Sequence, residues 1–155
     1  MVQAIPAGYA GVTPYLIISD AGRALDFYKK AFGATELMRF PMPDGKIAHA
    51  EMKIGEGIFM LADESPAEGY KSPRALGGTP VSMMFYVKDV DAVFARAVAA
   101  GAVARRPVKD QFYGDRSGTL EDPFGHTWTI ATHVEDVSAE EMERRMASMS
   151  SGQAA

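Results

Sequence analysis

Residues 120–130 read Leu120-Glu121-Asp122-Pro123-Phe124-Gly125-His126-Thr127-Trp128-Thr129-Ile130. The central Asp-Pro-Phe-Gly sequence is typical of a tight turn. The aspartate side chain caps the turn, proline fixes φ at the next position, and glycine tolerates the positive φ at the exit. Short apolar runs stand on both sides. The segment therefore predicts a β-hairpin.

The rest of the chain repeats one pattern twice. There are two apolar runs, at residues 15–18 and 83–87. After each run, apolar residues recur at the i, i+3, i+4, i+7, i+8 spacing of one helix face. The two stripes end at Gly33 and Gly101, and glycine is the usual residue after a helix. Their members are Ala24, Phe27, Tyr28, Ala31 and Phe32 in the first, and Val90, Val93, Phe94, Ala97 and Val98 in the second.

Three strand-like runs follow each predicted helix, at residues 35–40, 46–54 and 58–62 and at 103–108, 116–121 and 126–132. The repeating unit is therefore strand-helix-strand-strand-strand. The expected fold is α+β, with a first βαβββ module at residues 12–66, a Pro/Gly/Ser-rich linker at 67–80 and a second module at 81–134. A C-terminal helix is expected at 137–149, and all of these form one structural domain.

One βαβββ unit cannot cover both faces of its own sheet. We therefore expect the two modules to pair into a curved eight-stranded mixed sheet around a concave cavity. A bundle of unrelated hairpins is the alternative, but it does not explain the duplicated helix stripe.

Composition excludes several classes of protein. The chain has 155 residues, a formal net charge of −4 and no cysteine. No basic run is longer than two residues, so a nucleic-acid partner is not expected. No stretch approaches the roughly 20 apolar residues that span a bilayer, and the N-terminus lacks the pattern of a signal peptide. A cytoplasmic location is expected.

Three motifs resemble one family. They are residues 24–34 (Ala-Leu-Asp-Phe-Tyr-Lys-Lys-Ala-Phe-Gly-Ala), residues 111–116 (Gln-Phe-Tyr-Gly-Asp-Arg) and residues 122–128. Together they are similar to the vicinal oxygen chelate (glyoxalase/bleomycin-resistance/dioxygenase) superfamily, and most of all to its PhnB-like branch. The resemblance covers roughly residues 12–149. It implies the paired-module fold, a homodimer and a small organic molecule as the partner.

The resemblance also implies where a metal ion would bind. In the metalloenzymes of this family, the first and fourth strands of each module supply the ligands. Alignment on residues 26–28 places these positions at Thr13, Met60, Ser82 and Thr129. Hydroxyl and thioether groups are poor ligands for the divalent ions that His, Glu and Gln bind. We therefore expect no metal site and no cofactor.

His49 and Glu51 are the strongest candidates for a functional pair. They alternate with small and apolar residues on one strand and so share a face. This predicts that they line the cavity or face solvent. A His/Glu pair is suited to general acid/base catalysis, although an ordinary polar pair on the sheet is the alternative.

Further ligand-binding candidates come from both modules. Arg116 is a good partner for a carboxylate or phosphate, and Tyr113 offers a ring with a hydroxyl; a local Asp115–Arg116 pair is the alternative. Thr13, Met60, Phe85 and Thr129 complete the candidate lining. Trp128 and His126 share the opposite strand parity to Thr129 and are expected to be structural.

The C-terminal segment begins with a capping box at Ser138 and Glu141. Met142, Met146 and Met149 follow on one helix face. This face is expected to pack on its own chain, or to contact a second subunit.

The leading interpretation is a metal-free protein that binds, and possibly sequesters, an organic ligand or drug. The first alternative is a lyase, isomerase or dioxygenase-type enzyme that uses His49 and Glu51 or a non-standard metal site. A module that serves mainly in protein interaction is the other alternative.

Overall fold

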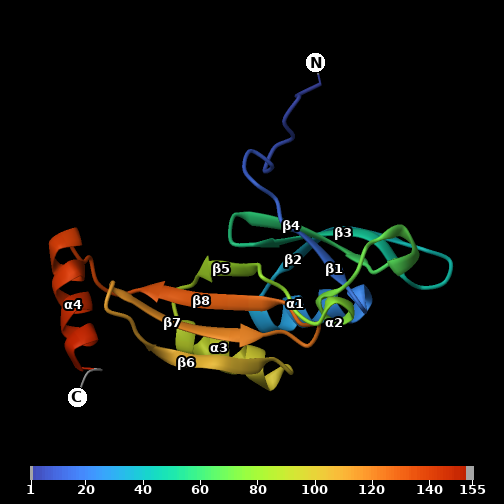
Figure 1. Ribbon diagram of the computed structural model, residues 1–155. Helices are drawn as coiled ribbons and strands as arrows, with labels where there is room; N and C mark the ends of the chain where they lie inside the picture. The colour runs from blue at the N-terminus through green and yellow to red at the C-terminus, as the bar shows by residue number, and fades with distance from the viewer. Residues whose placement is uncertain (1, 153–155) are drawn as a thin grey trace.

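The protein consists of two four-stranded sheets, each covered on one face by a helix. The computed structural model describes residues 2–152, with side chains for residues 2–149. The first sheet has the order β1 (Tyr15–Ile18), β4 (Gly57–Asp63), β3 (Ile47–Ile54), β2 (Thr35–Pro41), and the second has the order β5 (Ser82–Tyr86), β8 (Thr127–His133), β7 (Asp115–Glu121), β6 (Val103–Asp110). The main helices are α1 (Ala21–Phe32) and α3 (Val90–Ala99). Figure 1 shows the two sheets beside each other.

The predicted tandem βαβββ fold is confirmed. In each module the first strand lies parallel to the last, and the remaining pairs are antiparallel. The eight strands do not form one continuous hydrogen-bonded sheet: within the described residues, β1 and β5 are edge strands of separate sheets. The observed strands differ from the predicted runs by no more than two residues at either end.

The linker is more regular than its composition suggested. It contains a 3-10 turn, η1 (Pro66–Glu68), and a short helix, α2 (Pro73–Leu76). The backbone N–H of Ala75 donates to the Ser72 hydroxyl at 3.3 Å, which caps α2. Proline at the first helical position fits this start, since its missing N–H would be unpaired there anyway.

Both helices that cover a sheet, α1 and α3, start at an aspartate. The Asp20 carboxylate accepts the backbone N–H of Arg23 at 3.1 Å, and Asp89 accepts that of Ala92 at 3.0 Å. Such caps satisfy donors that have no partner within the helix. Gly33 ends α1 in the left-handed conformation, at φ 68°.

The core lies where the two modules meet. The α1 and α3 helices pack against each other, and Arg96 donates to the carbonyl of Ala31 at 2.9 Å. A group of rings fills the space between the helices and the two sheets: Phe27, Tyr28, Phe32, Phe59, Phe85, Phe124 and Trp128. Trp128 is 3% exposed, which confirms its predicted place in the core.

A buried carboxylate joins the modules. Asp122, in the β7–β8 turn, accepts the Tyr28 hydroxyl at 2.6 Å and the Trp128 indole N–H at 2.9 Å. Its other oxygen accepts the backbone N–H groups of Phe124 and His126. Burial, and then the negative charge of Asp122, raise the pKa of Tyr28 well above its ordinary value, so Tyr28 remains a hydrogen-bond donor.

His126 makes a second connection between the modules. It is 7% exposed, and its Nε2 lies 3.1 Å from the carbonyl of Ile17 in β1. A carbonyl only accepts, so Nε2 carries the hydrogen. The prediction that His126 is structural is confirmed.

The C-terminal helix, α4 (Ala139–Gly152), stands at the end of the second sheet that is farthest from the first module. It extends three residues beyond the predicted end. The Ser138 hydroxyl accepts the N–H of Glu141 at 3.2 Å, but the Glu141 carboxylate bonds to Arg144 and Arg145. Only half of the predicted capping box is therefore formed. Met142 is half-buried.

The buried carboxylate generates a stability prediction. Asp122→Ala leaves the Tyr28 hydroxyl and the Trp128 indole N–H buried without an acceptor, and each such loss costs about 1–3 kcal/mol. We expect the variant to lose roughly 3 kcal/mol or more of unfolding free energy in urea titrations.

Asp26→Ala is the matched control, because Asp26 is exposed on the same module as Tyr28. It should stay within about 0.5 kcal/mol of the parent. Equal stability of the two variants would show that the Asp122 hydrogen bonds do not hold the modules together.

Candidate functional site

The face of the first sheet that points away from α1, called here the outer face, carries the predicted His/Glu pair. Glu51 pairs in register with Met60 of β4 and Met38 of β2, and His49 pairs with Phe40. Neighbouring residues in the same strands point to α1 instead: Ala50, Met52 and Leu61 are fully buried. Strand alternation therefore places His49 and Glu51 on one face, as the sequence predicted.

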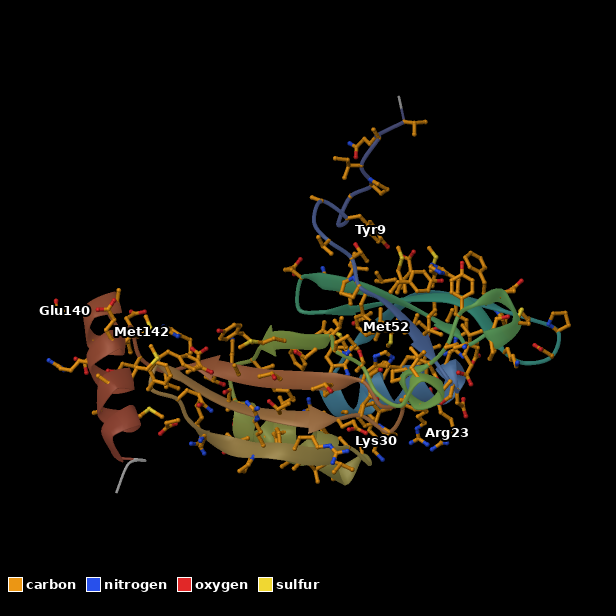
Figure 2. All side chains as sticks on the ribbon, viewed as in Figure 1. Tyr9, Arg23, Lys30, Met52, Glu140 and Met142 are labelled. Carbon is orange, nitrogen blue, oxygen red and sulfur yellow. The ribbon has the colours of Figure 1, made fainter. Side chains whose placement is uncertain are left out.

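A chain of hydrogen bonds connects four side chains on the outer face. Tyr9, in the N-terminal segment, donates to one oxygen of the Glu51 carboxylate. The other Glu51 oxygen lies 3.1 Å from Nε2 of His49, and Nδ1 of His49 lies 2.9 Å from the Tyr15 hydroxyl. Figure 2 shows Tyr9 between the N-terminal segment and the first sheet.

The charge of Glu51 fixes the direction of this chain. The hydrogen bond from Tyr9, and then the one from His49, lower the pKa of the Glu51 carboxyl, so it is ionised at neutral pH. A carboxylate only accepts, so Nε2 of His49 carries a hydrogen. In the neutral imidazole Nδ1 is then an acceptor for the Tyr15 hydroxyl. The lone pairs of the Tyr15 oxygen are therefore available to a hydrogen-bond donor on the outer face.

Apolar side chains surround this polar chain. The ring centroids of Tyr15 and His49 are 5.6 Å apart. The ring of Phe40 lies on the other side of His49, at a centroid distance of 6.3 Å. Tyr15 is 49% exposed and Phe40 is 57% exposed. Burial first, and then the nearby Tyr70 and Glu51, raise the pKa of Tyr15, so its hydroxyl stays protonated.

A pocket of about 690 Å³ opens beside Tyr15. Tyr70, Ile17 and Met42 give it apolar walls, and four carboxylates and one lysine line it: Asp44, Asp63, Glu64, Glu68 and Lys46. Asp63 has a structural role, because its carboxylate accepts hydrogen bonds from the backbone N–H groups of Ala21 and Ile47. The volume suits a small organic molecule, since such sites measure roughly 300–1,000 Å³.

The second sheet does not repeat this chemistry. Thr119 pairs with Thr129 in register as Glu51 pairs with Met60, so Ser117 and Thr119 stand where the first module has His49 and Glu51. The hydroxyls of Thr119 and Thr129 lie 3.0 Å apart. The two modules share a fold but present different surfaces.

The structure gives the strand partners of the predicted metal-ligand positions. Met60 pairs with Tyr15, and Thr13 precedes β1. Thr129 pairs with Met84, whereas Ser82 pairs with Thr127. The neighbouring positions therefore hold Tyr15 and Met60 in one sheet and Met84 and Thr129 in the other. Phenol, thioether and hydroxyl groups do not fit a divalent ion.

Within residues 2–152, no group of three or more His, Cys, Asp or Glu side chains is arranged to hold a metal ion. Over the same residues, no helix is both long enough and apolar enough to cross a bilayer.

Arg116 and Tyr113 do not join His49. Arg116 forms ion pairs with Asp91 at the start of α3, at 2.7 Å, and with Asp110, at 3.1 Å. The alternative of an Asp115–Arg116 pair is therefore wrong. Tyr113 lies in the β6–β7 turn beside Phe112, whose carbonyl accepts Arg145 of α4. Both residues belong to the α4 end of the second sheet.

Asp115 has different partners from those expected. It accepts the Tyr86 hydroxyl at 2.7 Å and lies 2.8 Å from Nδ1 of His133, whose Nε2 is 2.9 Å from Asp136. Hydrogen bonds to Asp136 and then Asp115 raise the pKa of His133. With both ring nitrogens engaged, His133 connects the end of β8 to the segment before α4.

Thr13 and Phe85 meet in a different place. With Trp128 they line a pocket of about 300 Å³ between the two modules, called here the intermodule slot. The predicted ligand-binding residues are thus divided. His49, Glu51 and Met60 lie on the outer face, Thr13 and Phe85 in the slot, Thr129 on the second sheet, and Tyr113 and Arg116 near α4.

Sequence reasoning missed two members of the polar chain. Tyr15 alternates with buried Leu16 and Ile18, so strand parity alone could have placed it on the exposed face of β1. Tyr9 lies in an irregular segment and contacts a residue 42 positions away, and no local pattern predicts such a contact.

A protein-family comparison matches residues 9–130 to the Glyoxalase/Bleomycin resistance protein/Dioxygenase superfamily. An uncharacterized protein of Mycobacterium tuberculosis is 46% identical over 144 residues, which cover 91% of this chain and 85% of that protein.

Two solved structures are also similar. TioX from Micromonospora sp. ML1 has a TM-score of 0.63 at 32% identity, over 83% of this chain and all of that chain. The At5g48480 gene product of Arabidopsis thaliana has a TM-score of 0.64 at 29% identity, over 79% of this chain and 98% of that chain.

The polar chain generates a titration prediction. Tyr9→Phe removes the hydrogen bond that most lowers the Glu51 pKa, so this pKa should rise toward its ordinary value. A lowered folded-state pKa stabilises the fold above the unfolded-state pKa, and this contribution is lost as pH falls through the folded value. Tyr9→Phe should therefore make stability less dependent on pH in that acidic range.

Carboxyl ¹³C NMR of Glu51 measures the pKa directly, and urea unfolding at several acidic pH values measures the linkage. Tyr70→Phe is the control: Tyr70 lines the pocket beside Tyr15 but makes no hydrogen bond to Glu51 among the described residues, so the Glu51 titration should stay unchanged. An unaltered Glu51 pKa in Tyr9→Phe would mean that the N-terminal segment does not rest on the sheet in solution.

Proposed function

The chain belongs to the glyoxalase/bleomycin resistance protein/dioxygenase superfamily, and from this premise we propose that it is a metal-free binding protein for a small organic molecule. The ligand lies on the outer face of the first sheet, above His49 and Tyr15. Sequestration of an organic compound, such as a drug, is the role that we assign to it.

The observation that carries this proposal is the polar chain in its apolar surroundings. A ligand site is usually an apolar concavity with a few polar groups that fix orientation. Here the Tyr15 hydroxyl and the His49 ring supply the polar groups. Tyr15 and Tyr70 line the pocket, and Phe40 stacks on the His49 ring outside it. The side chains at the family's ligand positions, which include Met60 and Thr129, favour binding without a metal ion.

An enzyme is the second candidate, because Glu51, His49 and Tyr15 form a relay. Glu51 orients the imidazole through Nε2, and Nδ1 accepts the proton of Tyr15. In such a relay Tyr15 passes its proton to Nδ1 and takes one from the substrate, and the reverse transfer returns a proton to the product. A lyase or isomerase that moves one proton on its substrate is the reaction class that these groups support.

We also propose that the protein is a homodimer. The outer face exposes Phe40, Met38 and Tyr15, and the matching face of the second sheet exposes Met84 and Tyr86. Apolar patches of this kind mark association sites in soluble proteins. A second copy of the chain, related by a two-fold axis, offers one face of each kind to the other.

Ligand binding generates the next prediction. A panel of small organic compounds, screened by thermal shift in the presence of EDTA, should yield a compound that stabilises the parent. At a concentration of 100 times Kd the gain is about 2.7 kcal/mol. His49→Ala should lose most of this gain, because the imidazole contacts the ligand.

His133→Ala is the matched control, since it removes the same ring from the α4 end of the other sheet. It should keep the full response to the compound. Tyr15→Phe separates the two functions: a binding protein keeps most of its affinity, whereas an enzyme loses turnover. A compound that stabilises parent and His49→Ala equally removes His49 from the site.

Dimerisation generates a separate prediction. Sedimentation velocity should give a species of about twice the 16.7 kDa chain mass. Phe40→Lys places a charge on the outer face and should shift the population toward monomer. Val98→Lys, at an exposed position of α3, should not. A parent that sediments as a monomer at all concentrations contradicts the proposal.

A further inference from the structure

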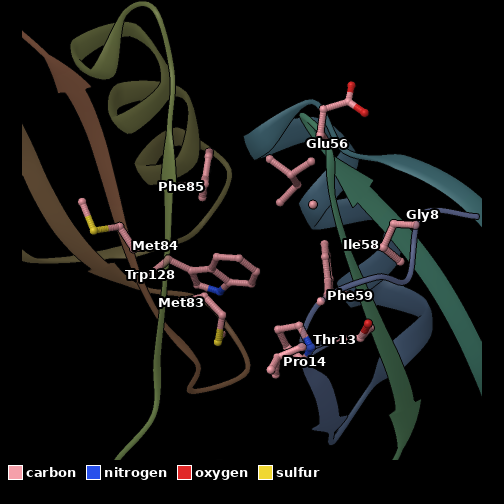
Figure 3. A pocket seen from close by; sticks show the side chains of 14 residues that line it. Gly8, Thr13, Pro14, Glu56, Ile58, Phe59, Met83, Met84, Phe85 and Trp128 are labelled. Atoms are coloured by element: carbon pink, nitrogen blue, oxygen red, sulfur yellow. The ribbon is translucent and has the colours of Figure 1, made fainter. Parts of the chain in front are cut away.

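The intermodule slot lies between the edges of the two sheets, and it shares no lining residue with the pocket beside Tyr15. Its walls come from β4 on one side and from β5 and β8 on the other, with residues of the N-terminal segment across one opening. Figure 3 shows Phe59 and Ile58 opposite Trp128, Met83 and Phe85. Phe59 pairs with Met52, which points to α1, so this ring lies on the other side of the sheet from His49.

We propose that the slot is a second binding site, which takes a small, uncharged aromatic molecule. Its volume of about 300 Å³ lies at the lower end of the range for ligand sites. Nothing in the proposed outer-face function requires it.

The rings of the slot favour an aromatic guest. Phe59 and Phe85 approach Trp128 at 5.6 and 6.1 Å, with interplanar angles of 69° and 80°. Rings arranged edge to face leave ring surfaces and edges available to a further ring, and such contacts contribute beyond simple area burial. The indole N–H of Trp128 is already bound to Asp122, so the ring is held in place.

The polar groups of the slot exclude a charged guest. Among the lining residues that the structure describes, Glu56 is the one ionisable side chain; it is 97% exposed and pairs with Lys53 at 2.9 Å. A charged molecule would therefore lose hydration without gaining a counter-charge. The Thr13 hydroxyl, which has no hydrogen-bond partner among the described residues, supplies one polar contact.

The slot is also able to adapt its width. The edge strands β1 and β5 belong to different sheets, so no strand ladder spans the slot within the described residues. Met83 and Met84 line its second wall. Methionine side chains are flexible and polarizable, and they adjust to guests of different shape.

The test uses the full chain, labelled with ¹³C at the methionine methyl groups, and N-phenyl-1-naphthylamine as the probe. The ten methionines report on different surfaces. Titration should move the Met83 and Met84 signals, assigned by Met→Leu variants, and should saturate at one probe per chain. The signals of Met38, Met42 and Met60 on and beside the outer face should stay.

Ile58→Glu puts a carboxylate in the slot and should weaken probe affinity at least about tenfold. Val98→Glu makes a matched change on the exposed side of α3 and should have no effect. Thr13→Phe fills the slot from its opening and gives the same loss if Ile58→Glu does not fold.

His49→Ala separates the two proposals, because it impairs the outer-face ligand and should leave the probe unaffected. Unmoved Met83 and Met84 signals, uptake that does not saturate, or shifts confined to the outer-face methionines overturn the slot proposal. None of these results bears on the outer-face function.

Discussion

The architecture depends on one buried carboxylate. Asp122 is 3% exposed and satisfies four donors: the turn's own backbone, the indole of its own module and the phenol of the other module. A buried charge is tolerated only where hydrogen bonds replace its hydration. The turn, the placement of Trp128 and the contact between the modules therefore depend on one side chain. The rings that pack around Tyr28 and Trp128 define the intermodule slot, so the slot also depends on this carboxylate.

The modules share a backbone plan and differ in surface chemistry. Their helices begin at equivalent aspartates, and their strands pair in the same order. Yet one sheet carries a charged chain that runs from Tyr9 to Tyr15, and the other carries paired threonine hydroxyls. Backbone geometry tolerates many side chains on an exposed sheet face, because packing constrains only the side chains that point to the helix. Function is thus able to diverge on the open face without a cost to the fold.

The fold was predictable because its signals are local. Alternation, turn glycines and helix stripes act over fewer than a dozen residues, and they located the strands to within two positions. The same alternation placed His49 and Glu51 on one face. The site was only partly predictable, because its closing contacts join distant residues. Tyr9 reaches Glu51 across 42 positions, and Arg116 pairs with Asp91 across 25. The pairing of Tyr15 with Met60 was also not predictable, because strand register depends on the partner strand, which periodicity does not specify.

The contact at Asp122 has a consequence for how the two halves relate. Counted from the helix caps Asp20 and Asp89, the position equivalent to Tyr28 is Ala97, whose side chain has no hydrogen-bond donor. The turn equivalent to that of Asp122 carries Glu56, which points to solvent. Each half therefore supplies one partner of the Tyr28–Asp122 hydrogen bond and lacks the other. Neither half can be exchanged for a copy of its sibling: two first halves would have two phenols and no acceptor, and two second halves would bury two carboxylates without a phenol. The repeat is symmetric in shape, but its two members have become mutually obligatory.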